Sequence, residues 1–148
     1  MNNRKVKIVV DIFMSMFLVL SFVRWSGNDG LVFHSIVGTG FTMLMVAHLY
    51  LNRKWLVSTT KSIKEGKANK KLKQLYVVDI ALIVVWSVAI VTGFLAIPWF
   101  VNNLEAFSAY SRIHSVTSRI GGVIILIHIY QHLGHIRSYL RLSKRPKN

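Results

Sequence analysis

Hydrophobic residues along this chain gather in four runs, with polar and charged residues between them. The runs cover positions 8–23, 31–51, 75–97 and 113–133. A helix needs about 20 mostly apolar residues to cross a hydrocarbon core of roughly 30 Å, so the last three runs are long enough to span a membrane. The first run is shorter and ends at Arg24-Trp25-Ser26-Gly27, which does not resemble a signal-peptide cleavage site. We therefore interpret it as a retained first span.

Composition supports a membrane protein over a soluble one. Hydrophobic residues make up 53% of the 148 positions and charged residues only 16%, where a soluble domain has about 25% charged residues. The chain has no cysteine, which excludes disulfides, thiolate zinc sites, cysteine-held iron–sulfur clusters and thioether-linked haem. We expect one transmembrane domain over residues 1–148.

The basic residues indicate the orientation of the helices. The net charge is +14, from 19 Lys and Arg against 5 Asp and Glu. The N-terminal segment, the central loop 52–74 and the C-terminal tail carry most of the cations: Arg4, Lys5, Lys7, Arg53, Lys54, Lys61, Lys64, Lys67, Lys70, Lys71, Lys73, Arg137, Arg141, Lys144, Arg145 and Lys147. The other two loops carry only Arg24 and Arg112. This positive-inside bias predicts that both termini are cytoplasmic, and it argues against nucleic acid as the partner.

The two longer loops each allow two interpretations. The cationic loop 52–74 is either a solvated segment lying against anionic lipid head groups or a docking surface for an acidic electron donor. The outer loop 98–112 is aromatic, with Trp99, Phe100, Phe107 and Tyr110. It is either an interfacial aromatic belt, including a short helix lying flat, or a lid over a site at the outer membrane face.

Histidines recur in an internal duplication. His34-Ser35-Ile36 in the second run matches His114-Ser115-Val116 in the fourth, and a second histidine follows fourteen residues after each first one. The second histidines lie in the segments His48-Leu49-Tyr50 and His128-Ile129-Tyr130. The first and third runs also share the sequence Val-Val-Asp-Ile around Asp11 and Asp79. The duplication predicts an all-α four-helix bundle built from two repeated helical hairpins.

Fourteen residues of helix place two histidines about 21 Å apart along the axis and within about 40° of one face. Because the second and fourth helices run in the same direction, His34 is expected level with His114, and His48 level with His128. Two facing imidazoles suit the axial positions of a haem iron and favour electron transfer over oxygen activation. Zinc fits less well, since each level offers two histidines and zinc expects three or four ligands. The remaining interpretation is that each histidine only bonds a neighbouring helix.

The segment His34…Gly38…His48-Leu49-Tyr50-Leu51-Asn52-Arg53-Lys54-Trp55 resembles small bacterial cytochrome-b-like membrane domains of unknown function. The spacing is also similar to that in the haem-bearing half of respiratory cytochrome b. The small bacterial cytochrome-b-like domains often accompany extracytosolic flavin-carrying proteins. The resemblance covers nearly the whole chain.

This resemblance implies two b-type haems with His34, His48, His114 and His128 as axial ligands. It also implies electron passage in the bacterial cytoplasmic membrane, between a quinone pool or cytoplasmic donor and an outer acceptor such as a flavoprotein. Two departures stand out. The chain has no recognisable flavin-attachment domain or quinone motif, and Ser118 replaces Gly38 in the second copy.

Several further residues are expected around the haems. Phe41 and Gly121 follow the first histidines by seven residues, so Phe41 is expected between the macrocycles and Gly121 at a close backbone approach. Ordinary small-residue helix packing is the alternative. Asp11 and Asp79 are expected either to bond an axial histidine N–H or to exchange protons at a quinone. The alternative is that both aspartates only lie near a helix N-terminus, where the helix dipole stabilises an acid.

Basic side chains are candidate partners for haem propionates. Arg119, with Arg24 and Arg112, is assigned to the outer haem. Arg53, with Lys54 and His132, is assigned to the inner one. His132 has two other candidate roles, contact with quinone and simple placement at the interface, and His135 is expected in solvent.

Three alternative functions stay open at this point. One is a quinol or superoxide oxidase acting through the outer haem near Trp99 or Tyr110. Another is a haem-free transporter with histidines and aspartates along a proton or metal path. The third is a haem-bearing anchor for a larger dehydrogenase. Homo-oligomerisation is compatible with all of them.

Overall fold

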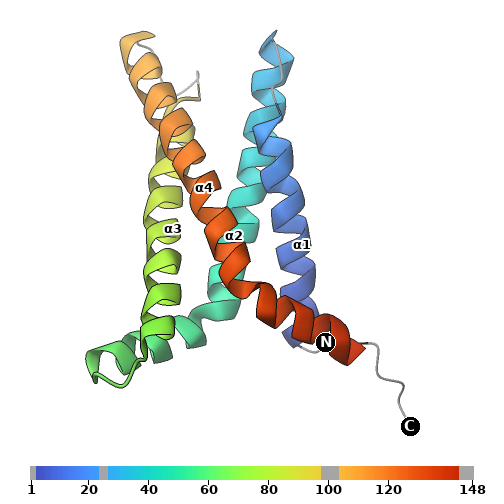
Figure 1. Ribbon diagram of the computed structural model, residues 1–148. Coiled ribbons are helices and arrows are strands. Elements are labelled where there is room, and N and C mark those ends of the chain that lie inside the picture. Colours follow the sequence, from blue (N-terminus) through green and yellow to red (C-terminus); the bar gives the residue numbers. More distant parts are fainter. Residues whose placement is uncertain (1–2, 24–26, 98–103, 144–148) are drawn as a thin grey trace. The chain divides into compact units, whose positions relative to one another are not determined.

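The computed structural model describes residues 3–23, 27–97 and 104–143. Its elements are α1 (Asn3–Phe22), α2 (Gly27–Lys64), α3 (Lys70–Leu95) and α4 (Leu104–Ser143), as Figure 1 shows. The other described residues form turns, bends or irregular segments. The prediction of an all-helical protein with four helices is therefore confirmed.

Three of the four helices are long and apolar enough to cross a membrane: α2 from Asp29 to Lys64, α3 over its whole length, and α4 from Phe107 to Leu133. Their outer surfaces carry apolar side chains, such as Met43 at 68% and Leu126 at 68% exposed. Exposed apolar surface of this extent is what lipid contact requires. Helix α1 differs because Lys5, Lys7 and Asp11 lie within its 20 residues. Its role as a fourth span stays a prediction.

The chain divides into two compact units, the first ending at Lys61. In this unit α1 and α2 run antiparallel. The Lys7 ammonium near the start of α1 donates to Asn52 Oδ1 of α2 at 2.8 Å. Further along, Gly40 lies against the ring of Phe17, where a Cβ would overlap the ring. The glycine thus allows the two helices to approach closely.

In the second unit α3 and α4 pack along their lengths, also antiparallel. Ala89 and Trp86 of α3 are buried, at 1% and 7% exposed. The indole of Trp86 lies against Gly121 of α4, where a Cβ would come 3.0 Å from Cε2. The contact between these helices therefore depends on a glycine that faces a large aromatic ring.

Two loop predictions need correction. Most of the cationic segment 52–74 is helix, because α2 continues to Lys64 and α3 begins at Lys70. After Gly40 the chain has no glycine or proline before Gly66, which lies just beyond α2. Gly66 takes the left-handed φ of +70°, a conformation that favours glycine. Asn69 then caps α3 by accepting from the Leu72 N–H at 2.8 Å.

The loop expected at 98–112 is likewise shorter, because α4 begins at Leu104. Phe107, Tyr110 and Arg112 thus belong to a helix. The expectations for Arg24, Trp99 and Phe100 lie outside the described residues.

Candidate functional site

We call α1 with α2 the first hairpin and α3 with α4 the second. In the first hairpin, His48 of α2 contacts Asp11 of α1. Its Nδ1 lies 2.7 Å from Asp11 Oδ1, and the side chains are 25% and 50% exposed. Asn52, one turn further along α2, donates its amide to the His48 carbonyl at 2.9 Å. The oxygen of the same amide accepts a hydrogen bond from Lys7. These contacts therefore form a connected polar group made from both helices.

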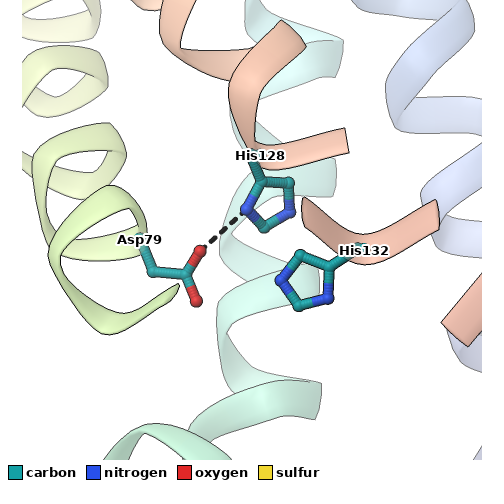
Figure 2. Close-up of side chains that lie close together, drawn as sticks. All are labelled: Asp79, His128 and His132. Atoms are coloured by element: carbon teal, nitrogen blue, oxygen red, sulfur yellow. Dashed lines mark hydrogen bonds and ion pairs between the residues drawn. The ribbon is translucent and has the colours of Figure 1, made fainter. Parts of the chain in front are cut away.

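His128 of the second hairpin makes the equivalent contact. Its Nδ1 lies 2.7 Å from Asp79 Oδ1, and the side chains are 28% and 16% exposed. Figure 2 shows Asp79 extending from α3 toward two imidazole rings of α4, those of His128 and His132. The centroids of these rings are 4.6 Å apart. One ligand atom from each of the three residues lies within 4.8 Å of the others, so this cluster can converge on one ion.

His114, nearer the N-terminus of α4 than His128, contacts the backbone of α3. Its Nδ1 lies 2.7 Å from the carbonyl oxygen of Ala89. Gly93 makes room for the ring, since a Cβ at that position would lie 2.8 Å from His114 Nδ1. A buried backbone oxygen and a glycine on the next turn of α3 together fix where this imidazole lies.

These three contacts have one chemical consequence. A carbonyl oxygen or a carboxylate only accepts hydrogen bonds, so Nδ1 of His48, His114 and His128 is the donor in each case. In a neutral ring the lone pair then lies on Nε2. Metal-bound histidines in proteins usually have this arrangement, with the second ring nitrogen donating to a carboxylate or a carbonyl. The expectation that Asp11 and Asp79 bond a histidine N–H is confirmed as a contact.

The other predicted site residues on α2 and α4 are His34, Gly38, Phe41 and Gly121. His34 is half-buried on α2, and nothing lies within 4 Å of a Cβ built on Gly38. Phe41 is buried, at 5% exposed. The close approach at Gly121 is to the Trp86 indole of the adjacent helix, which is the packing that small residues support between membrane helices.

Two described arginines of the predicted set, Arg53 and Arg119, contact their own helices. Arg119 Nη2 donates to Ser115 Oγ at 2.7 Å. Arg53 Nη1 donates to the Tyr50 carbonyl at 2.9 Å, and its guanidinium carbon lies 3.7 Å from the centre of the Tyr50 ring. Both contacts are exposed, so each guanidinium keeps donors that a propionate can use. The side chain of His135 lies outside the described residues.

Sequence reasoning missed some contributors to these sites. Asn52 could have been suspected from the sequence, because it follows His48 by one helical turn. Its bond from Lys7 could not, because it depends on the packing of α1 against α2. The Ala89 carbonyl has no side-chain signal at all. Gly93 acquires meaning only when its place opposite His114 is known.

Comparison of the chain with protein-family models, with curated proteins and with solved structures gives no match.

Substitution of Gly93 by alanine is expected to destabilise the second hairpin by about 1–3 kcal/mol. The added methyl group would lie 2.8 Å from His114 Nδ1, so the ring or the helix must move. Thermal unfolding in detergent measures the loss. Val91→Ala, on an exposed part of the same helix, is the control and should stay within about 0.5 kcal/mol. Equal midpoints for the two variants would show that His114 moves aside without cost.

Proposed function

We propose that this chain is a membrane cytochrome b that transfers electrons across the bilayer through two bis-histidine b-type haems. His34 and His114 would hold the outer haem, and His48 and His128 the inner one. The observation that carries the proposal is the shared state of His48, His114 and His128, each with Nδ1 bonded to an acceptor oxygen at 2.7 Å. In a neutral ring that state leaves the lone pair on Nε2, the atom that would bind a haem iron.

The residues fit a haem in three further respects. The chain offers no cysteine, so an axial pair must come from other donors, and histidine is a common one. The histidines recur at a spacing of fourteen residues, which separates two levels by about 21 Å along a helix. Exposed arginines at Arg53 and Arg119 supply cations near each level.

A bound haem would supply one-electron chemistry between ferric and ferrous iron, and two histidine ligands leave no open position for oxygen. The chain's own residues do the rest. Asp11 and Asp79 fix the tautomer and orientation of the inner rings, while the Ala89 carbonyl does so for His114. No proton or substrate needs to be moved for this function.

The proposal includes a bacterial cytoplasmic membrane location, with quinone, a cytoplasmic donor or an extracytosolic flavoprotein as redox partners. Its support is the resemblance of the His48–Trp55 segment to cytochrome-b-like domains and the basic residues of the inner segments. The predicted positive-inside orientation favours an electron donor and an acceptor at opposite membrane faces.

Purified protein tests the proposal through its reduced-minus-oxidised visible spectrum, with haem counted per chain. The expected result is a low-spin b-type spectrum and two haems. A colourless protein from cells supplied with ample haem would overturn it.

The orientation predicts opposite accessibility for two single-cysteine variants, which are simple to interpret because the chain has no native cysteine. Lys67→Cys, in the exposed turn between α2 and α3, should react with a membrane-impermeant maleimide only in inside-out vesicles. Asp29→Cys, in the first turn of α2, should react only in right-side-out vesicles. Labelling of both positions from the same side would contradict the proposed topology.

A further inference from the structure

We propose that Asp79, His128 and His132 form a binding site for a divalent transition-metal ion of the zinc class in the haem-free chain. Two imidazoles one turn apart on α4 face a carboxylate from α3 (Figure 2), and their ligand atoms lie within 4.8 Å of one another. Two histidines and one carboxylate are a recurrent donor set for Zn²⁺ and for non-haem Fe²⁺. The metal site itself does not depend on the proposed haem function.

The geometry requires only small side-chain movements. Metal–ligand bonds of about 2.0–2.2 Å place neighbouring ligands about 3.3–3.5 Å apart in a tetrahedral site. The donor atoms already lie within 4.8 Å, so rotations of the side chains suffice to close the site. A water molecule would fill the fourth position.

Burial favours a cation at this place. The Asp79 side chain is only 16% exposed, and a carboxylate removed from water is costly unless a positive charge or strong hydrogen bonds compensate it. The bond from His128 supplies one such compensation, and a divalent ion would supply a larger one. The half-buried imidazoles provide nitrogen ligands and add no negative charge.

The first hairpin lacks this donor set. Asn52 stands four residues after His48, where His132 stands four residues after His128. The Asn52 amide donates to the His48 carbonyl and accepts from the Lys7 ammonium. An amide in place of an imidazole, with an ammonium beside it, disfavours a divalent cation. We therefore expect one ion per chain.

Metal binding and haem ligation at His128 exclude each other through the tautomer. Nδ1 is the atom that faces Asp79. When Nδ1 coordinates a metal, the proton of the neutral ring moves to Nε2, which then cannot bind iron. When Nδ1–H donates to Asp79, Nε2 is the ligand atom. This consequence, unlike the metal site, rests on the proposed function.

The test is a Co²⁺ titration of the full-length chain produced without added haem precursor, with circular dichroism to verify helix content. The expected result is one Co²⁺ per chain with the visible absorption of a low-symmetry nitrogen–oxygen site. His132→Asn, which installs the residue found in the first hairpin, should weaken binding at least 10- to 100-fold. Unchanged Co²⁺ affinity in folded His132→Asn would overturn the proposal, as would no binding by the unaltered chain.

Haem uptake separates the two proposals. The Zn²⁺-loaded chain should take up one haem, whereas Zn²⁺-treated His132→Asn should take up two. Two haems in the Zn²⁺-loaded chain with the ion retained would overturn the exclusion. A chain that binds one Co²⁺ but never binds haem would support the metal site and overturn the cytochrome function.

Discussion

Alanine at any one of His34, His48, His114 or His128 is expected to lower the haem content from two to one per chain. An axial histidine supplies half of the protein's bonds to its iron, and the chain has no cysteine to replace it. The remaining haem should stay low-spin, because its two ligands are intact. Haem counting and a redox titration, which should resolve one midpoint instead of two, measure this loss. Met43→Leu, at an exposed position on α2, should retain two haems.

Double substitutions test the pairing. His34→Ala combined with His114→Ala should lose no more haem than either change alone, since both residues are assigned to the proposed outer site. His34→Ala combined with His48→Ala should lose both haems. Non-additivity of this kind identifies residues that act as a unit. Loss of both haems in the first double variant would show that the outer histidines serve different irons, and the pairing would be wrong.

The sequence predicted the helices well because apolar runs long enough for a membrane are visible without any structure. It predicted their ends poorly. Hydropathy reports where the apolar run stops, at Leu51, whereas the backbone hydrogen bonds of α2 continue to Lys64. Cationic residues support a helix as well as apolar ones do. The helix ends only where the chain turns at Gly66.

The candidate site was predicted in part for a similar reason. Asp11 and Asp79 attract attention as acids inside apolar runs that recur beside the histidines, and the structure places each within 2.7 Å of a histidine. The contact of His128 with His132 follows from their one-turn spacing. By contrast, the inclusion of Asp79 in one cluster with both rings depends on how α3 and α4 are aligned. That alignment is set by packing at positions such as Trp86 and Gly121.

Asp79→Asn is expected to raise the midpoint potential of the inner haem by about 60–120 mV. A carboxylate that accepts the Nδ1–H of an axial histidine makes the ring a stronger donor and stabilises ferric over ferrous iron. Asparagine removes that negative charge, so the ferric state loses stability and the potential rises. Removal of a hydrogen-bond partner from a metal ligand changes metal affinity by about 10- to 100-fold. When that change falls on the ferric state, each factor of ten corresponds to about 59 mV for one electron. A potentiometric titration followed in the visible spectrum measures the shift.

Asp11→Asn is the matched comparison, because Asp11 makes the same 2.7 Å contact with His48. The direction should be the same and the shift smaller, since Asp11 is 50% exposed and Asp79 only 16%. Water screens the charge at Asp11 more strongly. The outer haem should keep its potential in both variants, as its ligand His114 bonds the Ala89 carbonyl and no carboxylate. An equal rise in the potentials of both haems would mean that the aspartates act through general charge and not through the imidazole they hold. A fall in the inner potential would contradict the prediction.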